Sequence, residues 1–230
     1  MKEKAIFKEA MRAMTLSNLK ALKVFLKKDV FLYLIRHGQV NFPQLSFPGN
    51  TFHYDPEISQ KGYQQAQEAA RNLKEKTDID ILLTSPRRRV QETTNVFAAE
   101  LNLPYRIIQN LNDCAFYARW SAEKSKEILL SENPEKKFKK YFSEDQPFVF
   151  TYYITILSAL TKDVFSLYNQ GKIAIITHGE TIEVIKHLFS KKLLNGFLED
   201  GFLDSKPLPH CSVTKITLKK DHNPIIKALY

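Results

Sequence analysis

Short apolar segments recur along this chain, and polar residues or glycines end each of them. Residues 30–35, 80–84 and 173–177 are dominated by apolar side chains without alternation, which is typical of strands covered on both faces. A shorter strand is predicted over 105–108. A last one, over 212–218, alternates apolar and polar positions. The chain is thus predicted to contain five strands.

Between the strands, apolar residues recur at helical spacing. Ser59 has the character of an N-cap, and a helix is predicted from there to about residue 76. A long helix is predicted over 148–169, ended by Gly171, and another over 180–189. Residues 148–160 form the longest apolar run, which is too short to span a bilayer and predicts a buried core helix.

Ser85 and Pro86 predict another helix start, with Ser85 as N-cap and Pro86 as the first helical residue. Arg87, Arg88 and Arg89 would then lie in the first turn, where backbone N–H groups already favour an anion. A solvated basic surface is a sufficient explanation for Arg87 and Arg88. Three arginines at a helix N-terminus are mildly destabilising, so the group as a whole indicates a further role.

The composition narrows the function classes. The chain has 230 residues and a formal net charge of +9, which favours anionic partners. Its lysines are dispersed and not interleaved with aromatic residues, so no nucleic-acid partner is predicted. Lysines interrupt the first apolar residues, so neither a secretory leader nor stable membrane insertion is expected. Cys114 and Cys211 fit no metal or redox spacing, which favours a reducing compartment, and we expect the cytoplasm.

The polar residues that follow the predicted strands share one chemistry. Arg36 and His37 follow the first strand, Arg89 follows the second, and His178 follows the fourth. Because the carboxyl ends of parallel strands meet at one edge of a sheet, these groups are expected to line one crevice. Guanidinium forks and imidazoles fit a phosphoryl group. Neighbouring positive charge lowers a histidine's pKa, so at least one imidazole should be neutral and able to attack phosphorus.

In this order and spacing, these residues resemble the signature of the histidine phosphatase (phosphoglycerate mutase-like) superfamily, in particular its phosphatase branch. The resemblance covers roughly residues 31–218. The matching segments are Leu34-Ile35-Arg36-His37-Gly38, Ile58-Ser59-Gln60-Lys61-Gly62 with Gln65-Ala66, Ser85-Pro86 with Arg89 and Glu92-Thr93, and Thr177-His178-Gly179.

The resemblance implies an α/β fold, a three-layer α/β/α sandwich with a mainly parallel central sheet and a helical cap insertion at about 111–170. The histidine phosphatase domain is expected to span 29–230, after a basic helical N-terminal extension at 1–28. For that extension two interpretations stay open. It is a helix packed on the domain, or a basic helix that binds a membrane surface or a partner.

The resemblance also implies roles for single residues. His37 is expected to be the nucleophile that becomes phosphohistidine, with Arg36 and Arg89 binding the phosphoryl oxygens. His178 is expected to donate a hydrogen bond to the phosphoryl group as charge builds up. No cofactor and no metal is implied, and the sequence offers no carboxylate cluster that would hold a metal.

A carboxylic acid after the third strand protonates the leaving oxygen in this family. Asp113, in Leu111-Asn112-Asp113, aligns with that acid, although the family usually has Glu there. Glu180 is the alternative proton donor, although an acidic residue that stabilises a helix N-terminus is the simpler explanation for it. Both interpretations stay open.

Four further residues are predicted to bind substrate. Gly38 and Asn41 follow the nucleophile, Arg119 lies in an aromatic patch of the cap, and His210 precedes the last strand. Packing of the cap on the domain is the alternative explanation for the patch around Arg119.

The predicted function is a metal-independent phosphomonoester hydrolase that acts on a small phosphorylated substrate. The alternatives are a phosphoglycerate-type mutase and a catalytically weak module that binds a phosphoanion or a protein. Gln39-Val40-Asn41 replaces the Glu and Thr or Ser that many members have after Gly38, which argues against the mutases themselves. The oligomeric state stays open, a dimer included.

Overall fold

The structure is a computed structural model of the chain. It describes residues 26–41, 55–113, 127, 131–132, 146–190, 208–219 and 222–230. The predicted extension over 1–28 lies outside these residues except for its last three. Most of the predicted cap, between residues 114 and 145, lies outside them as well.

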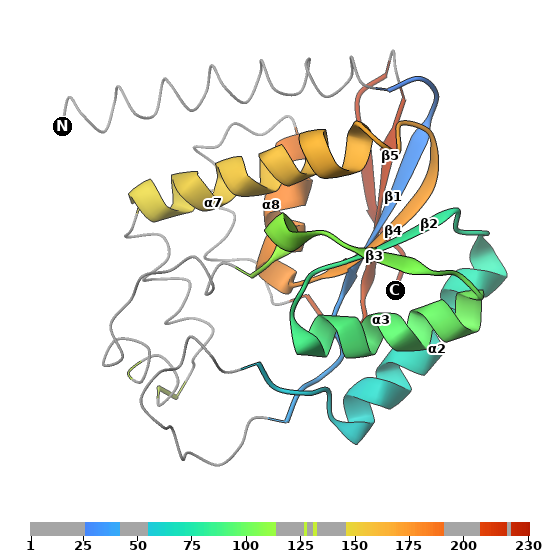
Figure 1. Cartoon of the computed structure of the whole chain (residues 1–230), viewed down its shortest axis with the longest axis vertical. Coiled ribbons are helices and arrows are strands. Elements are labelled where there is room, and N and C mark those ends of the chain that lie inside the picture. The colour runs from blue at the N-terminus through green and yellow to red at the C-terminus, as the bar shows by residue number, and fades with distance from the viewer. Residues whose placement is uncertain are drawn as a thin grey trace.

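The described strands form one six-stranded sheet, in the order β3-β2-β4-β1-β5-β6 (Figure 1). Their bounds are β1 (Val30–Arg36), β2 (Ile81–Thr84), β3 (Tyr105–Ile107), β4 (Gly171–Thr177), β5 (Val213–Leu218) and β6 (Ile225–Ala228). Strands β1 to β4 run parallel, while β5 and β6 are antiparallel additions at one side. The sheet is mainly parallel, as predicted.

Helices cover both faces of the sheet (Figure 1). On one face lie α2 (Gln60–Lys76) and α3 (Arg88–Leu101), and on the other lie α7 (Gln146–Ser158) and α8 (Gly179–Phe189). Successive side chains of β1 point to opposite faces, so Leu32 and Leu34 join the core under α7 and α8, and Tyr33 and Ile35 join the core under α2 and α3. This explains the apolar run without alternation, and the three-layer α/β/α sandwich is confirmed.

Ser59 is the N-cap of α2, as predicted, and its hydroxyl accepts a hydrogen bond from the N–H of Gly62 at 3.0 Å. The predicted start of α3 is wrong. The helix begins at Arg88 with Arg87 in the N-cap position, and Ser85 caps nothing. The reason is tertiary, because the Ser85 hydroxyl is hydrogen-bonded to His178.

The long predicted helix over 148–169 is divided. After α7, the chain continues as the π-helix η3 (Ala159–Phe165), and Gly171 opens β4 with a φ of +92°. The longest apolar run is indeed a core helix, since Tyr152 and Ile156 of α7 are completely buried. Strand β6 was not predicted; it is a short, largely exposed strand of four residues. In the described part of the chain, no helix is long and apolar enough to cross a bilayer.

Candidate active site

Backbone hydrogen bonds at the end of β1 bring three histidines together. The N–H of His37 donates to the carbonyl of Thr177 at 3.0 Å, and the N–H of Cys211 donates to the carbonyl of Arg36 at 3.0 Å. His37 therefore lies between His178, which follows β4, and His210, which precedes β5. The ring centroids of these two residues are 5.4 and 5.8 Å from that of His37.

The turn after β1 is fixed by the start of α2. Gly38 packs against Gly62 so closely that a Cβ on Gly38 would lie 2.6 Å from the Gly62 carbonyl oxygen. The backbone N–H of Ser59 donates to the carbonyl of Gln39 at 2.8 Å, and the amide oxygen of Gln65 accepts from the Gln39 N–H at 3.0 Å. These backbone contacts explain why the segment from Ser59 to Gln65 belongs to the site.

The contacts of His37 define its tautomer. Its Nδ1 lies 2.8 Å from the carbonyl oxygen of Gly38, which can only accept, so Nδ1 carries the proton. Its Nε2 is left with a lone pair and lies 3.4 Å from Nε of Arg89. Burial and the charges of His178, Arg89 and Arg36 hold the pKa of His37 well below its usual value. The ring is therefore neutral at neutral pH, with Nε2 facing the site.

His178 is held in the opposite way. Its Nδ1 lies 3.2 Å from Nη2 of Arg89, a group that can only donate, and its Nε2 lies 2.9 Å from the hydroxyl of Ser85. Burial and the charges of Arg89, Arg87 and Arg36 hold the pKa of His178 well below its usual value. The neutral ring thus carries its proton on Nε2.

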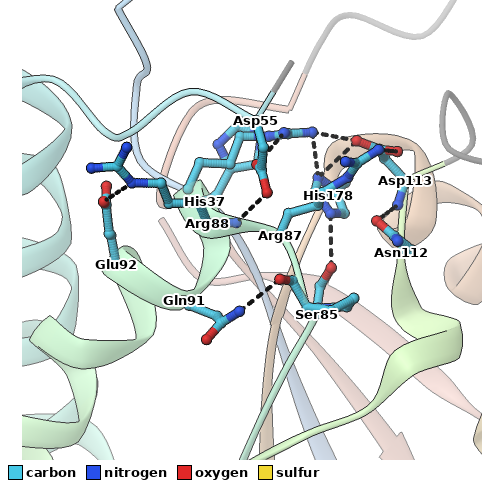
Figure 2. A network of polar contacts seen from close by, with 12 residues as sticks. His37, Asp55, Ser85, Arg87, Arg88, Gln91, Glu92, Asn112, Asp113 and His178 are labelled. Carbon is cyan, nitrogen blue, oxygen red and sulfur yellow. Dashed lines mark hydrogen bonds and ion pairs between the residues drawn. The ribbon is translucent and has the colours of Figure 1, made fainter. Parts of the chain in front are cut away.

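Arg89 connects both histidines with two carboxylates. Its guanidinium forms ion pairs with Asp113 and with Asp55, the latter at 3.3 Å. Asp55 also accepts a hydrogen bond from the N–H of Arg88, the first residue of α3, at 2.8 Å. In Figure 2, Asp55 and Asp113 lie on either side of His178. In the structure, the guanidinium of Arg89, which is predicted to bind phosphoryl oxygens, is thus paired with two carboxylates.

Arg87 is part of this network too. Its Nη2 lies 3.4 Å from Asp113, and its side chain is only 12% exposed. The prediction of a solvated surface residue is therefore wrong for Arg87. It fits Arg88, whose exposed guanidinium forms ion pairs with Glu57 and Glu92.

Buried hydroxyl groups from three elements fix the turn that carries Asp113. The hydroxyls of Tyr152 of α7 and Thr181 of α8 lie 3.1 and 3.3 Å from the carbonyl oxygen of Asn112 and 2.7 Å from each other, so one of them donates to that oxygen and the other to its neighbour. Thr177 of β4 donates to the carbonyl of Leu111 at 2.8 Å. The position of Asp113 is thus defined by both the sheet and the helices on one of its faces.

Arg36, the last residue of β1, comes directly before His37. One end of its guanidinium donates to the carbonyl of Leu208, and its Nε is buried without a hydrogen-bond partner among the described residues. A Cβ on Gly179 would lie 3.4 Å from that Nε, so a residue without a side chain leaves room for Arg36.

The structure brings together Arg36, His37, Arg89, His178, Asp113 and His210 of the predicted site. Burial and the charges of Arg36 and Lys61 lower the pKa of His210 to about 4. Gly38 is at the site, but its N–H donates to Thr93 at 3.0 Å, so packing is its observed part. Asn41 is exposed at the end of a described segment, and Arg119 lies outside the described residues, so their contacts with substrate stay predictions.

Sequence analysis missed the residues that support the site. Asp55, Thr93, Tyr152 and Thr181 act through contacts between distant elements, which no local pattern shows. For Thr93 alone a signal was available, because Glu92-Thr93 is part of the resemblance. Within the described segments, no three His, Cys, Asp or Glu side chains lie close enough to hold a metal ion.

A family model described as the histidine phosphatase superfamily (branch 1) matches residues 32–228. A protein of Schizosaccharomyces pombe named as a probable phosphatase is 25% identical over 177 residues, which are 70% of this chain and 79% of that protein. The fold is similar to phosphoserine phosphatase from Entamoeba histolytica in complex with 3-phosphoglyceric acid, with a TM-score of 0.61, 20% identity and coverage of 86% and 95% of the two chains. It is also similar to phosphoglycerate mutase from Bacillus anthracis, with a TM-score of 0.60, 15% identity and coverage of 90% and 95%.

Proposed function

The chain belongs to the histidine phosphatase superfamily, and on that premise we propose that it is a metal-independent phosphomonoester hydrolase that acts through a phosphohistidine on His37. One observation carries this proposal. The Gly38 carbonyl accepts a hydrogen bond from the protonated Nδ1 of His37, so that Nε2 presents a lone pair next to Arg89. A neutral, oriented imidazole beside guanidinium groups is what attack on a phosphoryl group requires.

Binding of the phosphoryl group relies on exchange of anions. Its oxygens bind the guanidinium of Arg89 in place of Asp113, and Arg36, the residue before His37, binds them as well. Arginine forks fit phosphoryl oxygens as well as they fit a carboxylate. The side chains thus supply the positive charge that the reaction needs.

The reaction then has two displacements. The Nε2 lone pair of His37 forms a bond to phosphorus while the bond between phosphorus and the leaving oxygen breaks, and a carboxylic acid gives that oxygen its proton. Water, losing a proton to the same carboxylate, then attacks phosphorus and breaks the bond to Nε2. Phosphate leaves, and His37 returns to its neutral form.

Asp113 is our first choice for the proton donor. It lies next to both Arg89 and His178, and its Oδ2 is 4.0 Å from Nδ1 of His178. When the phosphoryl group binds Arg89, the Asp113 carboxyl group loses one of its cationic partners and can turn to the leaving oxygen.

Glu180 remains the alternative. Its own burial and the negative charge of Asp113 raise its pKa, so it retains a proton to a higher pH than an exposed glutamate does. It follows His178-Gly179 directly at the start of α8.

The substrate that we propose is a small phosphorylated molecule. Phosphoserine phosphatase and phosphoglycerate mutase share the fold, and by their names they handle compounds of this kind. We propose that Asn41, Arg119 and His210 contact the part of the substrate beyond phosphorus. The buried free thiol of Cys211, whose pKa burial raises to about 12, fits the cytoplasmic location that we propose.

The test is hydrolysis of 4-nitrophenyl phosphate in the presence of a chelator, with the wild type and His37→Ala. We expect turnover that survives the chelator and falls by about 10⁴-fold or more in the variant. Phosphate that binds without turnover would instead favour the binding module. With a phosphorylated sugar acid, transfer to another hydroxyl group and no release of phosphate would favour a mutase.

A further inference from the structure

The ring of His178 is held at both nitrogens, and only one of these contacts faces the phosphoryl site. Nδ1 lies beside Arg89 and Asp113, which line the site. Nε2 points the other way, to the hydroxyl of Ser85 at the end of β2 (Figure 2). Both His178 and Ser85 are buried, so bulk water does not compete for this contact.

We propose that Ser85 is the positioning residue that, together with Arg89, holds the tautomer of His178 and aims its Nδ1 at the phosphoryl group. The proposal rests on the proposed function for its kinetic consequence but not for its structural part. The Ser85 hydroxyl accepts a hydrogen bond from Nε2. Nδ1 is therefore the nitrogen that can change from accepting to donating a hydrogen bond. A bond from the other ring nitrogen is the usual means by which proteins fix a histidine tautomer.

The two partners of Nδ1 follow from charge. In the free protein its lone pair accepts from Arg89 at 3.2 Å. When a phosphoryl group takes Arg89, its oxygens lie where Nδ1 must donate instead of accept. Nδ1 then gains one proton from solvent, Nε2 keeps its own, and Ser85 continues to accept. The groups around the ring are Arg36, Arg87 and Arg89 with positive charge, the Asp113 carboxylate at 4.0 Å, and the neutral ring of His37.

The position of Ser85 explains how it can have this role. Its N–H donates to the carbonyl of Ile176 at 3.1 Å, which joins the end of β2 to the end of β4 two residues before His178. The hydroxyl and the ring are thus held by one pair of neighbouring strands. A serine that capped α3, as predicted from the sequence, would point its hydroxyl at the helix and leave Nε2 without this partner.

The direct test is ¹⁵N NMR of the histidine rings near pH 7.5, with His178 assigned through its loss in His178→Asn. In the free wild type we expect a pyrrole-type Nε2 and a pyridine-type Nδ1. Addition of inorganic phosphate should convert Nδ1 to a protonated nitrogen, and Ser85→Ala should give a mixture of tautomers. A pyrrole-type Nδ1 in the free wild type, or an unchanged His178 in Ser85→Ala, would overturn the proposal.

The kinetic test compares Ser85→Ala with Ser85→Thr, which restores the hydroxyl, and with Thr94→Val as matched control. Thr94 is also buried, and its hydroxyl bonds to Thr84 and to the Val90 carbonyl, away from the histidines. We expect kcat to fall about tenfold in Ser85→Ala with little change in KM, less than for loss of a donor itself. Ser85→Thr should recover part of this loss, and Thr94→Val should lose none.

Equal effects of Ser85→Ala and Thr94→Val on kcat would mean that the Ser85 hydroxyl is merely structural. Absence of turnover in the wild type would contradict the proposed function but leave the NMR result as a separate decision on Ser85. Circular dichroism and thermal unfolding of each variant show that the fold is retained.

Discussion

Two strand ends of this protein have the same local plan, a strand followed by His-Gly, and they hold their histidines differently. After β1, the ring of His37 donates a hydrogen bond to the carbonyl of the next residue, Gly38. After β4, the ring of His178 donates its proton to a side chain from another strand, Ser85 of the segment after β2. One histidine is fixed by its own backbone and the other by a tertiary contact.

This difference matters because the two rings do different chemistry. A nucleophile needs an invariant lone pair at one nitrogen, and a backbone carbonyl next in sequence fixes that nitrogen wherever the turn is formed. A group that stabilises charge must change from accepting to donating, and a hydroxyl on the far side of the ring permits that change. The same sequence element thus has two uses, which its surroundings distinguish.

The largest expected effect concerns which of the two histidines is phosphorylated. Phosphorylation of His178 would contradict the roles given above. We expect no phosphoenzyme in His37→Asn and a detectable one in His178→Asn, because Nδ1 of His178 is protonated when a phosphoryl group binds and Nε2 of His37 keeps its lone pair. His178→Asn should lower kcat by about 10²- to 10³-fold, as for loss of one donor to the developing charge. Rapid quench with labelled substrate and mass spectrometry measures both. A phosphohistidine at residue 178 would reverse the two roles.

A smaller effect would show which carboxyl group protonates the leaving oxygen of the substrate. Asp113→Asn should slow phosphoryl transfer from an alkyl phosphate to His37 about 10²-fold, while the first-turnover burst of 4-nitrophenol from 4-nitrophenyl phosphate, whose leaving oxygen needs no proton, keeps nearly the same rate. Glu180→Gln is the matched control and should affect both substrates equally. If Glu180→Gln shows the selective loss and Asp113→Asn does not, Glu180 is the proton donor.

The smallest effect concerns stability. His37, His178 and His210 all have pKa values below the ordinary 6.5, that of His210 at about 4. Below pH 6.5 the unfolded chain therefore binds protons that the folded protein does not, and the free energy of unfolding should fall as the pH is lowered from 6.5 to 4. Denaturant unfolding should show a smaller fall in His37→Asn and His178→Asn. Thr94→Val should shift stability equally at each pH, and an unchanged slope in the histidine variants would contradict this account.

The parts of the fold that could be predicted were those with a local cause. Strands β1 and β4 follow from unbroken apolar runs, and α2 follows from Ser59 and its helical spacing. The convergence of Arg36, His37, Arg89 and His178 could be predicted because parallel strands end at one edge of the sheet.

What could not be predicted depends on contacts between distant elements. Ser85 before a proline is the pattern of a helix cap, and only the presence of His178 at 2.9 Å gives its hydroxyl a different partner. Arg87 has the sequence pattern of a surface residue, and only its ion pair with Asp113, from another loop, shows that it belongs to the site. Asp55 had no pattern at all, because its carboxylate reaches both the α3 N-terminus and Arg89 across the sheet edge.

Strand β1 has a consequence for the synthesis of this protein. Both of its neighbours, β4 and β5, come from the second half of the chain, with Arg36 opposite Thr177 and Ile35 opposite Val213. At ordinary translation rates, about ten seconds or more pass between the appearance of β1 and that of its first partner. During this time the most apolar strand of the protein has two open edges, and the nucleophile it carries has no site. We expect a nascent chain halted before Gly171 to bind chaperones and to be open to proteases, and the catalytic centre to be assembled among the last parts of the fold.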